Sequence, residues 1–233
     1  YKPAEIARLI ETAGVAKAAL PAAQMFVLAL LAGAFIGFGA AAYTMVMTGT
    51  DTAFGPARFL GGLVFSLGLI LVIIGGAELF TGNALMTMAA VERRISLPAL
   101  LRNWAIVYAG NLVGAVALAA GFALSSLLDG PMGATAVKIA EAKAALPPLD
   151  AFVRGVLCNA LVCLAVWLTF AARDVAGKIF AILWPISAFV LLGLEHSVAN
   201  MYLLPQGMLA GSAVTLQAAV LNLLWVTLGN ILG

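Results

Sequence analysis

The chain has 233 residues, of which 64% are hydrophobic and 9% are charged, and its formal net charge is +2. This composition excludes a water-soluble globular protein, because too few polar residues are present to cover an apolar core. It predicts an all-α integral membrane protein. We expect no nucleic-acid partner for a chain of this kind.

The first predicted element is an amphipathic cytoplasmic helix over residues 1–23, in which five charged residues lie among apolar ones (Lys2, Glu5, Arg8, Glu11 and Lys17). This mixture fits a helix on the membrane surface and does not fit a cleavable signal peptide. Six apolar runs follow, each long enough to be a transmembrane helix. They cover residues 24–47, 59–90, 100–128, 151–172, 179–204 and 208–232.

Two of these runs carry a related motif, G-x-E-x-x-x-x-N, at residues 76–83 and 193–200. A second echo links residues 103–114 with residues 222–233. The chain is therefore an internal duplication, and we predict one transmembrane domain made of a first repeat (24–128), an outer loop (129–150) and a second repeat (151–233). Because three crossings separate the two motifs, the second repeat runs in the opposite direction. The prediction is a 3+3 inverted repeat.

The second apolar run is too long for one straight crossing, since its helix would measure roughly 48 Å against a hydrocarbon core of about 30 Å. Gly75, Gly76 and Gly82 bracket residues 78–81, where a break would let backbone groups line an enclosed cavity. The fifth run has equivalent reasons to break at Pro185, Gly193 and Pro205. We therefore expect transmembrane helices 2 and 5 to be interrupted.

The basic residues of the connections predict the orientation. Eight lie on the side of the N-terminus (Lys2, Arg8, Lys17, Arg93, Arg94, Arg102, Arg173 and Lys178), and four lie on the other side (Arg58, Lys138, Lys143 and Arg154). An excess of Lys and Arg marks the cytoplasmic side. Both termini are therefore expected in the cytoplasm.

His196 is the only histidine and lies deep in an apolar run. It is the one buried group there that could titrate near neutral pH, so we interpret it as a functional residue that faces a pathway. The alternative is a neutral imidazole that is hydrogen-bonded within the helix bundle.

Four polar residues flank the two breaks: Glu78, Asn83, Glu195 and Asn200. The carboxylates could contact a substrate or an ion, but a structural role is the stronger interpretation. In that role they accept hydrogen bonds from the backbone N–H groups that each break releases. The asparagines would pin the breaks.

Three further polar residues are candidates. The Thr81 hydroxyl could donate to an anion or bond its own helix, and Lys143 could attract anions at a pore mouth or simply be solvated. Asn159 could line a pore or tie two helices together. Phe65, Leu69, Leu79 and Phe189 could form apolar constrictions or be ordinary packing residues.

The sequence does not favour a metal centre or a disulfide. Cys158 and Cys163 stand about 140° apart on a helix, so they suit neither a shared metal nor a bond to each other, and we interpret them as packing residues. With a single histidine, a conventional metal site is not expected, and no cofactor is predicted.

The motifs at residues 78–83 and 195–202 resemble the two signatures of the formate/nitrite transporter family, and the resemblance covers essentially the whole chain. It implies a homopentamer of aquaporin-like, six-helix protomers, each with its own pore for small monovalent anions such as formate, nitrite or hydrosulfide. By this resemblance Thr81 matches the loop threonine, His196 the central histidine, Lys143 the vestibule lysine and Asn159 a pore asparagine. The slit residues are matched by Leu69, Leu79, Phe189 and, less closely, Phe65.

The functional prediction is a channel or transporter for small weak-acid anions, with formate preferred and proton-coupled passage at His196. It would reside in the cell membrane of a bacterium or archaeon. Another version keeps His196 protonated, so that the anion itself passes. A neutral-solute pore of aquaporin type shares the inverted repeat, but no Asn-Pro-Ala triplet occurs. An intramembrane hydrolase lacks a G-x-S-x-G motif and an evident activated nucleophile.

Overall fold

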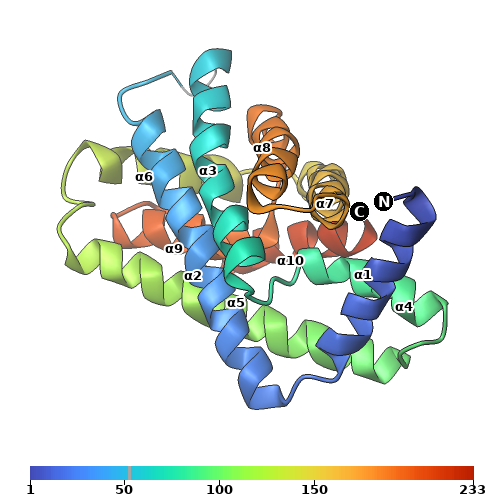
Figure 1. Ribbon diagram of the computed structural model, residues 1–233. Coiled ribbons are helices and arrows are strands. Elements are labelled where there is room, and N and C mark those ends of the chain that lie inside the picture. The colour runs from blue at the N-terminus through green and yellow to red at the C-terminus, as the bar shows by residue number, and fades with distance from the viewer. Residues whose placement is uncertain (52–53) are drawn as a thin grey trace.

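The computed structural model describes residues 1–51 and 54–233, and within these ranges every regular element is a helix (Figure 1). Among the described residues, four helices can cross a membrane by length and composition: α2 (Ala22–Met47), α3 (Gly55–Gly75), α5 (Leu97–Leu124) and α7 (Pro148–Ala171). Two apolar helices of 17 residues, α8 (Val175–Leu191) and α10 (Leu216–Leu232), complete the set of six predicted spans.

The second span is interrupted, as predicted. Helix α3 ends at Gly75, and Gly76 takes the left-handed conformation, with a φ of +79°. Residues 77–79 have no regular secondary structure and lead to the 3-10 helix η1 (Gly82–Met86) and to α4 (Thr87–Val91). The chain therefore turns where glycine makes a positive φ inexpensive.

The fifth span breaks in the same way, because α8 ends at Leu191 and Gly193 has a φ of +69°. Helix α9 (Ser197–Leu209) begins directly after the break. Both prolines that were expected to favour the interruption, Pro185 and Pro205, lie inside helices instead. The glycine sets the position of the break.

The connection over residues 129–150 is not simply a loop. It contains α6 (Pro131–Ala144), which begins with a proline at a favourable first-turn position and continues through an alanine-rich segment of high helix propensity. The predicted N-terminal helix is present as α1 (Pro3–Ala18). Because α1 precedes the first repeat as α6 precedes the second, each repeat gains a short leading helix.

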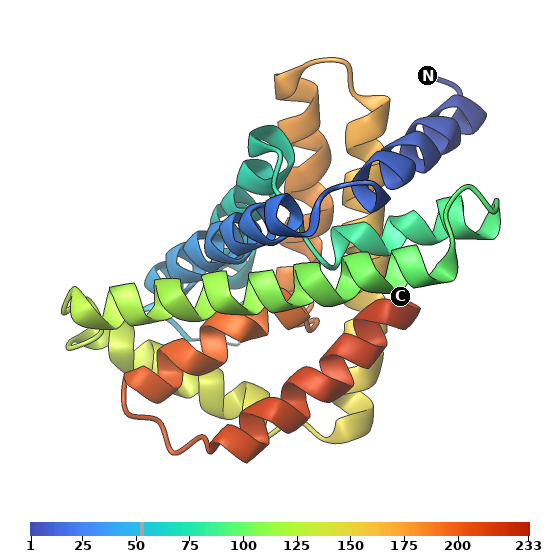
Figure 2. The ribbon, with the colours of Figure 1, turned by 90° about the horizontal axis from the view of Figure 1, so that it is seen from below.

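Close backbone contacts repeat between the two halves. A methyl group at Gly114 of α5 would overlap the Leu30 carbonyl oxygen of α2, and one at Gly233 would overlap the Val156 carbonyl oxygen of α7. Only glycine lets the helices approach this closely. Helix α5 packs against both α2 and α9 (Figure 2).

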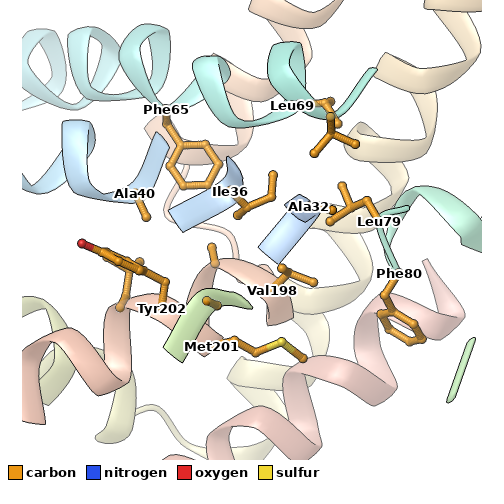
Figure 3. Close-up of a cluster of buried hydrophobic side chains, with 14 of the residues drawn as sticks. Ala32, Ile36, Ala40, Phe65, Leu69, Leu79, Phe80, Val198, Met201 and Tyr202 are labelled. Atoms are coloured by element: carbon orange, nitrogen blue, oxygen red, sulfur yellow. The ribbon is translucent and has the colours of Figure 1, made fainter. Parts of the chain in front are cut away.

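The centre of the core lies between α2, α3, the first break and α9. In Figure 3, Ala32 and Ile36 of α2 lie between side chains of α3 and of α9. Leu69 and Leu79 point toward one another beside this cluster, and both line one of the cavities described below. The two breaks therefore meet next to an apolar core.

Residues predicted on the side of the N-terminus do gather around α1. Arg94 pairs with Glu11 at 3.2 Å, and the Arg173 guanidinium lies 5.0 Å from the centre of the Tyr1 ring. Both termini lie toward the same end of the molecule in Figures 1 and 2, as an even number of crossings requires.

Candidate functional site

A polar network holds the first break. Lys17 Nζ lies 2.6 Å from Glu78 Oε1, and Asn83 Nδ2 donates to Glu78 Oε2 at 2.7 Å. Asn83 also donates to Asn103 Oδ1, while Asn103 donates back to the Lys17 carbonyl oxygen. The buried carboxylate is thus paired with a cation and further hydrogen-bonded, which offsets its desolvation.

The second break repeats this network residue by residue. Lys143 Nζ lies 2.8 Å from Glu195 Oε1, and Asn200 Nδ2 donates to Glu195 Oε2 at 2.7 Å. Asn200 donates to Asn222 Oδ1, and Asn222 donates to the Lys143 carbonyl oxygen. Lys143 therefore forms an ion pair beside the break and is not a freely solvated loop lysine.

The expectation that the carboxylates accept from released backbone N–H groups is wrong. At the first break an asparagine of α5 does this, because Asn111 Oδ1 accepts from the Phe80 N–H at 2.9 Å. Asn111 Nδ2 also donates to the carbonyl oxygens of Glu78 and Ala29. A carboxamide can serve donors and acceptors together, whereas an ionised carboxylate only accepts.

At the second break Asn230 of α10 plays the same part. Its Oδ1 accepts from the Ser197 N–H at 2.8 Å, and its Nδ2 donates to the carbonyl oxygens of Glu195 and Gly155. Asn111 and Asn230 were visible in the second sequence echo, but no role was predicted for them.

The two breaks meet through one hydrogen bond, between Thr81 Oγ1 and His196 Nε2 at 2.9 Å. Both side chains are buried, His196 with 3% of its surface exposed. His196 Nδ1 accepts from the Ala199 N–H and so caps α9. An accepting Nδ1 carries no proton, so a neutral ring has its single proton on Nε2 and donates it to Thr81.

Helix α7 holds the loop threonine by its backbone. Asn159 Nδ2 donates to the carbonyl oxygens of Thr81 and Asn230, and Cys163 Sγ contacts the Thr81 carbonyl oxygen at 3.8 Å. Asn159 is thus the interhelical tie that was one of its two predicted roles. Its Oδ1 atom, which is buried and has no protein partner in the described chain, remains available as an acceptor.

Two vestibules approach this centre and share no lining residue. The α6-side vestibule, of about 350 Å³, is lined by residues that include Lys143 and His196. The α1-side vestibule, of about 300 Å³, is lined by residues that include Lys17 and Leu79. Thr81 lines neither vestibule.

The predicted constriction residues divide between the two vestibules. Phe65 and Phe189 line the α6 side and pack edge to face at 5.5 Å, and Phe189 stacks on the His196 ring at 5.8 Å. Leu69 and Leu79 line the α1 side. The α1-side vestibule therefore ends in apolar side chains before the Thr81–His196 pair, whereas the α6-side vestibule reaches His196 beside Phe65 and Phe189.

Comparison with known proteins agrees with this architecture. The family model described as formate/nitrite transporter matches residues 4–233. The chain belongs to the formate/nitrite transporter family. It is a multi-pass membrane transport protein and not an enzyme.

Curated members of the family include formate transporters and channels. A probable formate transporter of Methanothermobacter thermautotrophicus is 41% identical, with 99% of this chain and 92% of that protein covered. The formate channel FocA of Escherichia coli K12 is 37% identical, with 99% of this chain and 89% of that protein covered.

Solved structures of the family share the fold. An FNT family ion channel superimposes with a TM-score of 0.88 at 31% identity, covering 98% of this chain and 94% of that chain. A pentameric formate channel with formate bound gives a TM-score of 0.80 at 36% identity, covering 91% and 92%. The aquaporin-like fold predicted for the formate/nitrite transporter family is therefore confirmed.

Proposed function

We propose that the chain is a channel for small monovalent weak-acid anions, that formate is its substrate, and that the anion crosses the centre as the neutral acid. The observation that carries this proposal is the buried Thr81–His196 hydrogen bond between two lysine-bearing vestibules. The formate channels among the relatives support the choice of substrate.

Energetics favour the neutral species at the apolar constrictions. Moving a carboxylate into a low-dielectric interior costs on the order of 20 kcal/mol in the idealised limit and still several after relaxation. Protonating a carboxyl group of pKa about 4 at pH 7 costs only about 4 kcal/mol. Neutralisation is therefore the cheaper route past Phe65, Phe189, Leu69 and Leu79.

The hydrogen bonds of His196 define its part in this step. A ring whose Nδ1 caps α9 has one proton to offer, and loss of that proton would leave an imidazolate, which is too basic to form here. His196 therefore acts as a hydrogen-bond donor that binds the small acid together with Thr81. The proton of the acid comes from water in the vestibule, where the net positive charge of the lining, which includes Lys143 on one side and Lys17 on the other, first concentrates the anion.

The test is formate uptake by proteoliposomes over a pH series. We expect His196→Ala to lower the rate about a hundredfold, the size of effect seen when one preorganised donor is removed. His196→Asn is the matched control, because asparagine retains an acceptor for the α9 cap, but its amide donor does not reach the position of the ring Nε2. It should fold normally and still transport slowly. Wild-type rate and pH dependence in both variants would remove His196 from the mechanism.

Two further measurements separate the alternatives. A formate-dependent current would contradict passage as the neutral acid and favour a charged pathway. Rates for nitrite, hydrosulfide and other small acids, measured alongside formate, test the choice of substrate. Water swelling without anion uptake would support a neutral-solute pore instead.

The assembly and the orientation belong to the same proposal. We expect a homopentamer in which each protomer has its own pore, which native mass spectrometry of the solubilised protein would test. We place the α1 side in the cytoplasm of a bacterial or archaeal cell, because α1 and the connections near it hold more Lys and Arg than the opposite side. Reporter fusions to both termini would test this orientation.

A further inference from the structure

The two vestibules differ in charge. The α6-side vestibule is lined by Arg58, Lys138, Lys143 and Arg154, with Glu195 as its carboxylate, which gives a formal charge of +3. The α1-side vestibule is lined by Lys17 and Lys178, with Glu78 as its carboxylate, which gives +1. A strict inverted repeat would give the two vestibules the same charge. The difference in charge therefore comes from residues that the two repeats do not share.

Arg154 is one source of the difference. Its carbonyl oxygen accepts from the Glu195 N–H at 3.3 Å, and the Leu28 carbonyl oxygen accepts from the Glu78 N–H at 3.2 Å. Arg154 and Leu28 therefore occupy equivalent places in the two repeats. One repeat has an arginine where the other has an apolar side chain.

Arg58 has a basic counterpart, since it is the fourth residue of α3 as Lys178 is the fourth residue of α8. Its position is nevertheless distinctive, because a methyl group built on Gly193 would lie 2.5 Å from Arg58 Nη2. The equivalent glycine of the other break, Gly76, has open space at that place. Arg58 thus lies against Gly193, whereas Lys178 does not contact Gly76 in the same way.

The two arginines converge on one residue. Arg154 Nη1 lies 3.5 Å from the Gly193 carbonyl oxygen, and Arg58 Nη2 lies against the same glycine. Both arginines are partly buried. The ion pairs found in the described chain involve other cations, so neither guanidinium has a carboxylate partner there. Two like charges that reach the same residue repel each other, and an anion shared between them would relieve the repulsion.

We propose that Arg58 and Arg154 form an anion-binding subsite at the α6-side mouth, which captures a planar monovalent carboxylate or a similar oxyanion before it reaches His196. The chemistry is that of the guanidinium group, whose planar fork matches two oxygens of one anion. The proposal rests on the proposed function, because the captured anion is the transported one.

A sided affinity follows. The α6-side face half-saturates at a lower anion concentration than the α1-side face, by about three- to tenfold for this difference in charge. In a passive channel at equal pH and zero potential, detailed balance requires the same ratio of Vmax to KM in both directions. The face with the lower KM therefore also saturates at a proportionally lower flux.

The experiment exchanges the two equivalent residues. Formate KM is measured in right-side-out and inside-out membrane vesicles for the wild type, for Arg154→Leu and for Leu28→Arg. We expect Arg154→Leu to raise KM about three- to tenfold from the α6 side alone, and Leu28→Arg to lower KM from the α1 side. Equal wild-type KM values on the two faces, or an Arg154→Leu change of equal size on both, would overturn the subsite.

Arg154→Lys keeps the experiment informative should the leucine variant fold poorly. It keeps the charge but loses the planar fork, so KM should fall between the values for the wild type and Arg154→Leu; a wild-type KM would overturn the role of the guanidinium pair. Failure of the proposed function looks different, because the wild type would then take up no formate from either face. Formate uptake without sidedness refutes the subsite alone.

Discussion

The two helix breaks are built on one plan and differ at their centre. At the first break the motif presents Leu79 and Thr81, and at the second break the same positions are His196 and Val198. Leu79 lines the α1-side vestibule and His196 lines the α6-side vestibule. The duplicated residues hold the backbone, and the residues that differ provide the one polar contact across the centre. The residues that the two breaks share therefore have a structural role, and under the proposed function the residues that differ are the ones that contact the transported acid.

The largest losses of stability are expected for the two buried asparagines that hold the backbone of the breaks. Asn111→Leu would leave the Phe80 N–H and the carbonyl oxygens of Ala29 and Glu78 without their partner, at about 1–3 kcal/mol for each buried group. Asn230→Leu should cost a similar amount at the other break. The yield of folded protein and its thermal unfolding in detergent measure both losses. Unequal losses would show that the two scaffolds are not energetically equivalent.

The ion pairs should give a smaller and unequal effect. Glu195→Gln would leave Lys143 unpaired with 16% of its side chain exposed, and we expect a loss of about 3 kcal/mol. Glu78→Gln should cost about half as much, since Lys17 has 31% of its side chain exposed and retains more solvent. Thermal unfolding compares the two variants directly. A greater loss for Glu78→Gln would contradict this ranking.

Exchanging the central residues tests the functional asymmetry. Thr81→Val gives the first break the residue of the second, removes the hydroxyl bonded to His196 and should lower formate flux about tenfold, as expected for one lost hydrogen bond. The matched change Val198→Thr adds a hydroxyl without a known partner and should leave flux nearly unchanged. Equal effects of the two variants on proteoliposome uptake would show that the hydrogen bond between Thr81 and His196 does not control the rate.

The smallest effect is expected at the rim. Lys138 is exposed on α6 at the mouth of the more basic vestibule, so its charge is strongly screened. Lys138→Thr should raise the formate KM from that side by about twofold at low salt, and the difference should vanish in 0.5 M salt at about a 4 Å screening length. A change that persists in high salt would indicate direct contact with the anion.

Much of the fold follows from the sequence alone. Apolar length locates the six spans, and the repeated glycine, glutamate and asparagine locate both breaks and the inversion between them. These features depend on local composition and spacing. The helix within residues 129–150 was missed because the predicted loop was inferred from polarity, whereas its alanines favour a helix.

The polar network could be predicted only in part. Lys17 and Glu78 are 61 residues apart, but Lys143 and Glu195 are 52 apart, so no constant offset aligns the two lysines. The bonds from Asn83 to Asn103 and from Asn200 to Asn222 span 20 and 22 residues. Insertions between helices change these separations while the contacts remain. Only the packing of α1 and α6 against the breaks reveals that the lysines are equivalent.

The equivalence of α1 and α6 has a consequence for how such a protein can arise. A half-length ancestor that began with its own surface helix would already contain the lysine, the glutamate and the asparagines that hold one break. Two copies inserted with dual topology would close the same bundle without any added element. After gene fusion, each copy could diverge separately. Substitutions where the two breaks meet could then make a symmetric assembly asymmetric at its centre.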